Sequence, residues 1–347
     1  MSVESKVKSF IDEKIDQGLF TGASVVFAQN GRKFVSVHRG SLSKRSISPV
    51  NASTTFDLQS MTKALVTGPL FLKLQKDKKI DLDAPIGQYL PASAPKNLAN
   101  SRISFRHLLT HSAGFSDVDM EEHFESPYEF WNKIFTAPIH SEPGNAIEYS
   151  DLGYRILGKL LESVLGESLE SAAHRYLFSA SVSRELGYST LDPFNVAGCP
   201  NAHGAVDDEQ VRQLGGILGC DGLFGSAEGI FKLLSGLIKD ELGFGGTLGY
   251  FLHQNIVSAP VEAKSYFDAL AAGSKSIGWE VNPKEFTYAG KFHTPQTFEK
   301  AGGAGTFAWF DEANGGDSGL ESGQWQRCSA DIGQRCSPPR MRPDVSV

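Results

Sequence analysis

The spacing of apolar residues near the start of the chain predicts a helix followed by a hairpin. Five apolar residues recur there at helical spacing: Val3, Val7, Phe10, Ile11 and Ile15. Gly18 follows them as a stop signal. Residues 23–29 and 32–38 are rich in β-branched and aromatic residues, and Asn30-Gly31 joins them as a tight hairpin turn. We therefore expect an antiparallel sheet with the first helix packed on one face.

The pattern becomes helical in the middle of the chain and returns to strands near its end. Residues 56–165 read mainly as helices between proline-marked loops, and Pro69 predicts a kink in the helix after Ser60. Residues 297–311 join a glycine-rich turn to an apolar, aromatic run, which predicts a strand pair. We predict one α+β domain over 1–313, with an antiparallel sheet built from about 1–58 and 225–313, flanked by helices, and a helical part inserted at 59–224.

The last 34 residues, 314–347, differ from the rest of the chain. Only four of them belong to the Leu, Ile, Val and Phe group: Leu320, Ile332, Val345 and Val347. This share is below the roughly one fifth under which a segment rarely holds a core. We predict a polar, disordered tail.

Charge and hydropathy narrow the partners and the compartment. A formal net charge of −7 offers no positive field to a phosphate backbone, so nucleic acid is not an expected partner. No apolar run is long enough to cross a membrane. Charged residues within 1–17 leave no room for a secretory signal, so we expect a cytoplasmic protein.

The cysteines and histidines do not suggest a metal centre. The four cysteines lie too far apart for a zinc site or a disulfide framework, and the apolar stretch around Cys220 predicts a buried thiol. His107 and His111 are four residues apart, but no glutamate follows His107, and packing roles are favoured. No metal or organic cofactor is implied, and the oligomeric state stays open.

Ser60 and Lys63 are the first candidates for chemistry. A lysine three residues after a serine lies on the same helix face, where a neutral amine can take the serine proton. The same spacing begins at Ser5, Ser41 and Ser93. Only Ser60 is followed by an apolar helix, which would bury Lys63, lower its pKa and place Ser60 at the positive helix end. The alternative is that Ser60 is a helix N-cap without chemistry.

A second motif is Tyr149-Ser150-Asp151, which precedes an apolar helical stretch. The tyrosine can relay a proton to a leaving group. Tyr266 and Asp268 have the same spacing, so the surroundings rather than the triplet carry the signal.

A third motif lies on the glycine-rich strand and contains Lys300, Gly302 and Gly303. Glycines let a substrate approach the backbone, and a free N–H there could join that of Ser60 in holding an oxyanion. Lys300 would discourage protonation of Lys63 and attract an anionic substrate.

The order and spacing of these motifs resemble the serine β-lactamase and penicillin-binding-protein superfamily, marked by S-x-x-K, Y-x-N and K-T-G or H-T-G. The resemblance covers roughly residues 5–311 and is closest to the class C-like branch, which includes β-lactamases, esterases and D-alanyl-D-alanine peptidases. Four longer stretches carry it: KKIDLDAPIGQYLP, ISFRHLLTHSAGF, EPGNAIEYSDLGYRILGKLLESVLG and LGGILGCDGLFGSAEGIFKLL.

The resemblance implies a β-lactamase/transpeptidase-like fold and a role for each motif. Ser60 would be acylated, Lys63 would act as general base, and Tyr149 would assist proton transfer. The N–H groups of Ser60 and Gly303 would form the oxyanion hole, and Lys300 would take the third-motif place. The substrate would be a small acyl compound.

The chain departs from the family pattern at three places. Asp151 stands where the family usually has asparagine, and its charge would favour protonated Lys63 and weaken the base. Ala301 replaces the usual hydroxyl residue and so removes a donor for a substrate carboxylate. The apolar strand and C-terminal helix that the family carries after the third motif are missing from the sequence beyond Asn314, which would impair activity.

We therefore hypothesise a serine hydrolase that cleaves carboxylic esters or related acyl compounds through a Ser60 acyl-enzyme. One alternative is a β-lactamase or D-alanyl-D-alanine carboxypeptidase. The other is a catalytically silent β-lactamase-like protein that serves binding or scaffolding.

Overall fold

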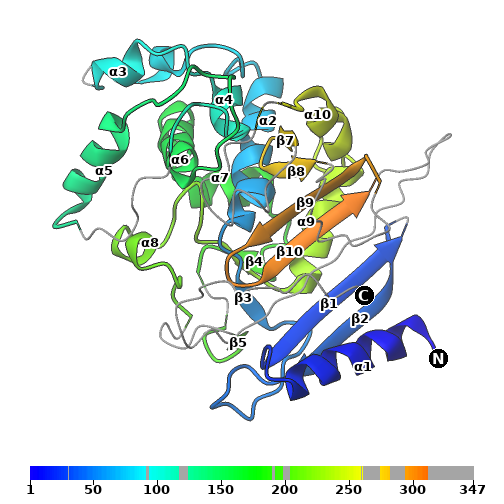
Figure 1. Ribbon diagram of the computed structural model, residues 1–347. Helices are drawn as coiled ribbons and strands as arrows, with labels where there is room; N and C mark the ends of the chain where they lie inside the picture. The colour runs from blue at the N-terminus through cyan, green and yellow to red at the C-terminus, as the bar shows by residue number, and fades with distance from the viewer. Residues whose placement is uncertain are drawn as a thin grey trace.

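Figure 1 shows the computed structural model, with the N-terminal helix and hairpin at one side and the helical region at the other. The structure describes residues 1–29, 31–90, 94–116, 124–189, 192–197, 204–258, 260, 274–281 and 294–311. The strands β7 to β10 lie between these two parts, and helix α9 passes behind them. The molecule therefore has the α+β layering that the sequence predicts.

The N-terminal helix and hairpin have the predicted form. Helix α1 (Val3–Asp16) begins at the N-cap Ser2, and strands β1 (Gly22–Gln29) and β2 (Arg32–Gly40) pair antiparallel. Ile11 and Phe20 pack with apolar side chains of the hairpin in a small core separate from the main one. The amphipathic spacing is thus explained by one buried helix face.

The predicted strand pair near the end of the chain is also confirmed. Strands β9 (Thr297–Gly302) and β10 (Thr306–Asp311) pair antiparallel, and β8 (Trp279–Val281) and β7 (Ser274–Ser276) continue the sheet in the order β10-β9-β8-β7. Within the described ranges, β1 and β2 form a sheet of their own. The calls on the missing strand, the missing helix and the tail from 314 fall outside these ranges.

A third small sheet adds short strands to the middle of the chain, which we expected to be mainly helical. Strand β3 (Thr55–Asp57) pairs with β5 (Val196–Ala197) and with β6 (Phe224–Gly225), and β6 also pairs with β4 (Leu186–Gly187). Strands of two or three residues are too short to show an alternating pattern, so the sequence analysis missed them. This sheet matters because Ser60 follows its strand β3.

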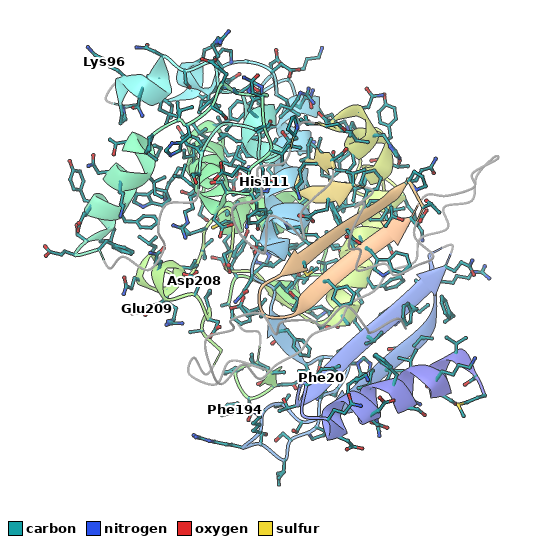
Figure 2. All side chains as sticks on the ribbon, viewed as in Figure 1. Phe20, Lys96, His111, Phe194, Asp208 and Glu209 are labelled. Carbon is teal, nitrogen blue, oxygen red and sulfur yellow. The ribbon has the colours of Figure 1, made fainter. Side chains whose placement is uncertain are left out.

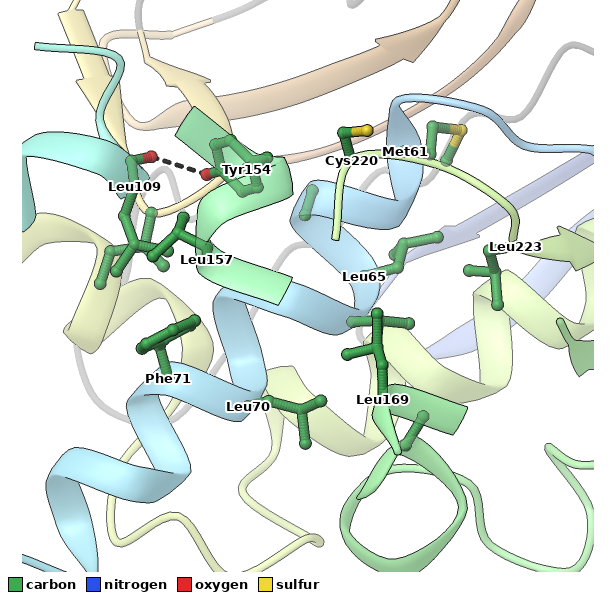
Figure 3. Packing of buried hydrophobic residues seen from close by; sticks show 14 of the residues in the cluster. Met61, Leu65, Leu70, Phe71, Leu109, Tyr154, Leu157, Leu169, Cys220 and Leu223 are labelled. Atoms are coloured by element: carbon green, nitrogen blue, oxygen red, sulfur yellow. Dashed lines mark hydrogen bonds between the residues drawn. The ribbon is translucent and has the colours of Figure 1, made fainter. Parts of the chain in front are cut away.

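The remaining elements are helices that surround the main core. They are η2 (Ile86–Tyr89), α3 (Lys96–Ala99), α4 (Phe105–Leu109), α5 (Pro127–Thr136), α6 (Asp151–Leu165), α7 (Leu169–Tyr176), α8 (Glu209–Gln213), α9 (Ala227–Ile238) and α10 (Leu248–Gln254). The main core packs these helices against two sheets, the one formed by β3 to β6 and the one formed by β7 to β10. Figure 3 shows part of it, where Leu65, Leu70 and Phe71 pack against Leu157 and Leu169.

The helix after Ser60 is irregular where the sequence predicts a kink. It starts with α-helical Met61 and Thr62, continues as the π-helix η1 (Lys63–Thr67), and returns to α-helix as α2 (Gly68–Lys76). Pro69 therefore occupies the first turn of α2, where a missing N–H and a fixed φ are tolerated. The π-helix, which begins at Lys63, thus ends just before the turn that contains Pro69.

Candidate active site

The turn that carries Ser60 is held by two hydrogen bonds. Leu58 donates its N–H to the Leu223 carbonyl at 2.8 Å, and the buried Asp57 carboxylate accepts the Gln59 N–H at 3.1 Å. Gln59 takes a left-handed conformation with φ 45°, which only a well-held turn imposes on such a residue. The helix begins directly after Ser60, so the serine lies at its positive end as predicted. Figure 3 shows Met61, which follows Ser60 in the chain, and Leu223 on the neighbouring segment.

Two functional groups from different motifs meet at the Ser60 hydroxyl. Lys63 Nζ donates a hydrogen bond to Ser60 Oγ at 2.9 Å, and the Tyr149 hydroxyl donates another at 3.0 Å. The structure thus brings together the first two motifs of the sequence analysis. A hydroxyl that faces one amine and one phenol has a partner for proton uptake and another for proton donation.

The charge of Lys63 follows the predicted effect of Asp151 rather than the predicted effect of burial. Burial is the largest single effect and lowers the pKa of this fully buried lysine. Asp151, whose carboxylate lies 2.6 Å from Nζ, outweighs it together with Tyr149 and Cys220 and raises the pKa well above the ordinary value. The ammonium also donates to the Cys220 carbonyl at 3.1 Å. Three acceptors therefore hold Lys63 in its protonated form. The predicted effect of the Asp151 charge is confirmed, whereas the net lowering of the Lys63 pKa expected from burial was wrong.

Tyr149 is held in a neutral, proton-donating state. Burial raises its pKa above the ordinary value, although the Lys63 charge opposes this effect. Its ring stacks on the His111 ring with centroids 4.4 Å apart, and Lys300 Nζ lies 4.7 Å from the Tyr149 ring centroid. The Ser150 N–H donates to His111 Nδ1 at 3.1 Å, which ties the imidazole to the start of α6. Figure 2 shows His111 among the helices.

Helix α6 is in turn anchored to α4, which keeps both motifs in place. The Tyr154 hydroxyl donates to the Leu109 carbonyl at 2.7 Å (Figure 3). Residues 153–159 belong to this one continuous helix. The buried, anchored helix explains how Asp151 in its first turn reaches Lys63.

Lys300 lies on β9 and is buried as deeply as Lys63, with 2 % of its surface exposed. Its ammonium donates to Glu280 Oε1 at 2.9 Å, and Lys275 Nζ donates to the same oxygen at 3.3 Å. Burial lowers the pKa of Lys300 to about 8, helped by the charges of Lys63 and Lys275 and opposed by Glu280. We expected Lys300 to keep Lys63 uncharged; instead Lys63 stays charged and Lys300 is the lysine whose pKa is lowered.

Gly302 and Gly303 bring strand β9 against the Ser60 turn. A side-chain carbon at Gly302 would lie 2.3 Å from the Leu58 carbonyl oxygen, so only glycine fits there. One at Gly303 would meet the Gln59 side-chain oxygen at 2.6 Å. In the part of the chain that is described, neither the Ser60 nor the Gly303 N–H donates to a backbone carbonyl. This pair of N–H groups stays our prediction for an oxyanion site.

The sequence analysis missed three contributors to the site. They are the Cys220 carbonyl, Glu280 and Lys275. Cys220 lies in one of the four stretches that carry the resemblance, but a backbone carbonyl leaves no mark on the residue type, and Glu280 and Lys275 lie in segments without a recognisable motif. Cys220 itself is buried as predicted, and burial raises the pKa of its thiol to about 12. His107 completes a capping box with Ser104 at the start of α4, in keeping with a packing role. The alternatives Ser93 and Tyr266 lie outside the described residues.

A known protein family matches most of the chain. The family model for Beta-lactamase matches residues 7–320. The chain belongs to the Beta-lactamase family, and its fold is β-lactamase/transpeptidase-like. No helix among the described residues has the length and apolar character that crossing a bilayer requires.

Curated relatives match parts of the chain. Protein flp of Staphylococcus aureus strain COL is 26% identical over 171 residues, which are 48% of this chain and 34% of the relative. The match therefore spans about a third of the length of that protein. A putative D-alanyl-D-alanine carboxypeptidase of Escherichia coli K12 is 27% identical over 310 residues, covering 77% of this chain and 68% of the relative.

Solved structures share the fold over most of the chain. EstCE1, a hydrolase with promiscuous acyltransferase activity, has a TM-score of 0.69 and 21% identity, with 88% of this chain and 90% of that chain covered. The D-amino acid amidase from Ochrobactrum anthropi SV3 has a TM-score of 0.71 and 19% identity, with 94% and 91% covered. At these identities the similarity establishes the fold alone.

Proposed function

We propose that this protein is a serine hydrolase that cleaves carboxylic esters or related acyl compounds through a covalent Ser60 acyl-enzyme. The observation that carries the proposal is the Ser60 hydroxyl, which lies 2.9 Å from Lys63 Nζ and 3.0 Å from the Tyr149 hydroxyl. The match to the Beta-lactamase family over residues 7–320 supports it.

In acylation, Ser60 Oγ attacks the ester carbonyl while its proton passes to a neutral Lys63 amine. The alcohol then leaves as the C–O bond breaks, and Tyr149 donates its proton to the departing oxygen and regains one from Lys63. Water later attacks the acyl-enzyme and releases the acid. Because Asp151 favours the charged form of Lys63, we expect the rate to increase as pH rises.

Two features of the site favour esters over β-lactams and peptidoglycan peptides. Ala301 follows Lys300 on β9 and has no hydroxyl to donate to a substrate carboxylate. Asp151 contributes a negative charge close to Ser60, and its side chain is 25% exposed. Both features weaken the binding of a substrate that carries a carboxylate, as β-lactams and peptidoglycan peptides do. A cytoplasmic location, away from peptidoglycan, stays a prediction.

A catalytically silent binding protein is the second candidate, and one observation favours it. The Lys63 ammonium contacts three acceptors, Ser60 Oγ, Asp151 and the Cys220 carbonyl, which matches its three protons. An ammonium whose three protons are all hydrogen-bonded loses a proton reluctantly, and only the neutral amine can act as a base. This candidate predicts a well-folded chain that does not react with activated acyl compounds.

Intact-mass spectrometry separates these readings. The chain and its Ser60→Ala variant are incubated with a fluorophosphonate and, separately, with a penicillin. We expect one fluorophosphonate adduct that disappears in Ser60→Ala. A stable penicillin adduct at Ser60 would instead favour the β-lactamase or D-alanyl-D-alanine carboxypeptidase alternative. Folded protein without any adduct at pH 7 or pH 9.5 would refute the hydrolase proposal and leave the binding protein.

A further inference from the structure

Lys300 belongs to a buried group of three charged side chains on the sheet next to the site. Lys275 on β7, Glu280 on β8 and Lys300 on β9 occupy three consecutive strands, and all are buried. Lys275 is 1% exposed, although lysines are almost never fully buried without a partner. Its side chain takes no part in the chemistry proposed above.

The two lysines compete for a single carboxylate oxygen. Glu280 Oε1 accepts from Lys300 at 2.9 Å and from Lys275 at 3.3 Å. Glu280 Oε2 has no hydrogen-bond partner among the described residues. Each ammonium therefore receives only part of the neutralising charge of Glu280, although both are shielded from water.

The groups around Lys300 show why this sharing affects the site. They are Glu280 on β8, Lys275 on β7, Lys63 on η1, Tyr149 and Asp151 at the start of α6, His111 after α4, and the buried neighbour Glu299 on β9. Lys63 is already paired with Asp151, and burial keeps His111 neutral by lowering its pKa well below the ordinary value. Glu280 is the carboxylate that contacts Lys300, so whatever draws Glu280 away leaves more positive charge facing Tyr149 and Ser60.

We propose that Lys275 is a positioning residue for Lys300 that sets the preference of the site between anionic and neutral esters. By holding Glu280 Oε1, Lys275 prevents Lys300 from being fully neutralised, and the remaining charge attracts a substrate with a negative group. The inference rests on the proposed ester hydrolysis for its substrate. The electrostatic coupling itself does not depend on activity.

The test uses the full chain with Lys275→Met, which keeps the volume of the side chain, and Lys275→Gln, which keeps a hydrogen-bond donor. Lys275→Arg serves as the charge-conserving variant. Lys73→Met removes the same charge from the partly exposed ion pair between Lys73 on α2 and the C-cap residue Asp77, and it serves as the matched control. Two p-nitrophenyl esters of equal length are compared, a neutral pentanoate and a hemiglutarate that carries a carboxylate.

We expect both neutral variants to lower the anionic-to-neutral ratio of kcat/KM about fivefold to tenfold at pH 7. In the unmodified chain this ratio should fall as pH rises through about 8, where Lys300 loses its charge. In Lys275→Met the fall should move to higher pH, because Glu280 then pairs with Lys300 alone and raises its pKa. Lys275→Arg should restore the ratio, and Lys73→Met should leave it unchanged.

A second measurement separates this inference from the proposed function. NMR of the chain labelled with ¹³C-lysine, with the Lys300 signal assigned through Lys300→Met, follows Lys300 whether or not esters are cleaved. We expect its titration midpoint to rise by about one pH unit in Lys275→Met. An unchanged midpoint, or an unchanged ester ratio in an active chain, overturns the role of Lys275. Failure of every variant to cleave either ester, with the midpoint shifted, overturns only the ester hydrolase.

Discussion

Two buried lysines lie near the Tyr149 ring beside Ser60, and they differ in charge state. Lys63 and Lys300 are both withdrawn from water, and each ammonium lies within 3 Å of a carboxylate. Yet the pKa of Lys63 is raised well above its ordinary value, whereas that of Lys300 is lowered to about 8. Burial lowers both pKa values, so burial cannot explain the difference.

The difference comes from how the carboxylates are divided. Asp151 pairs with Lys63 at 2.6 Å, and a backbone carbonyl and a hydroxyl complete the shell of that ammonium. Glu280 is shared between Lys300 and Lys275. The comparison teaches that the number of cations for each carboxylate, rather than depth in the protein, decides which lysine releases a proton near neutral pH.

Replacing Lys63 and Lys300 one at a time should produce the largest difference, which we expect in the rate of Ser60 labelling. Lys63→Met should slow fluorophosphonate labelling of Ser60 about a thousandfold, because the amine that takes the serine proton is lost. Lys300→Met should slow it only about tenfold, because Lys300 contacts the Tyr149 ring rather than Ser60 Oγ. The labelling rate constants of folded protein measure both. Equal losses of labelling rate in the two variants would contradict different roles for Lys63 and Lys300.

Exchanging the carboxylate at Lys63 should make the two lysines more alike. In Asp151→Asn the charge that raises the pKa of Lys63 is gone while burial remains, so this pKa should fall. More neutral amine is then present at pH 7, and kcat/KM for p-nitrophenyl pentanoate should rise about tenfold or more. The rising limb of the pH–rate profile should move to lower pH.

The surface variant Asp77→Asn removes a carboxylate from the partly exposed pair with Lys73 and serves as the control. It should leave the profile unchanged. A slower Asp151→Asn variant with the rising limb in its original place would show that Lys63 is not the base.

The contact between strand β9 and the turn that carries Ser60 can be tested through the stability of the protein. Gly302→Ala should lower the free energy of unfolding by about 2 kcal/mol, because the new carbon would lie 2.3 Å from the Leu58 carbonyl oxygen and backbone must move. Gly303→Ala is the matched comparison, since its carbon meets only the flexible end of Gln59. Urea denaturation should show a loss of less than about 1 kcal/mol there. Equal losses would mean that β9 does not press on the Ser60 turn.

The smallest effect is expected at Ala301, next to Lys300. Ala301→Thr would return a hydroxyl donor to β9 and should speed formation of a penicillin adduct about threefold, with little change for a neutral ester. Mass spectrometry of timed reactions gives both rates. A similar gain for both probes would indicate that the hydroxyl does not contact the penicillin carboxylate.

Local elements of the fold were predictable because their causes are local. The spacing of Val7, Ile11 and Ile15 and the Asn30-Gly31 turn correctly predicted α1 and the β1–β2 hairpin. The glycine-rich turn correctly predicted β9 and β10. The strands β3 to β6 were missed, because two or three residues show no period and pair only when distant segments meet.

At the site, the sequence by itself determined which residue types could do the chemistry and that Lys63 would lie one helical turn from Ser60. Only the tertiary structure decided their charges. The Cys220 carbonyl is 157 residues from Lys63 in the chain, and Glu280 is 20 residues from Lys300. Electrostatic coupling depends on distance in space and on what is shared with a third group such as Lys275, and neither quantity can be read from spacing along the chain.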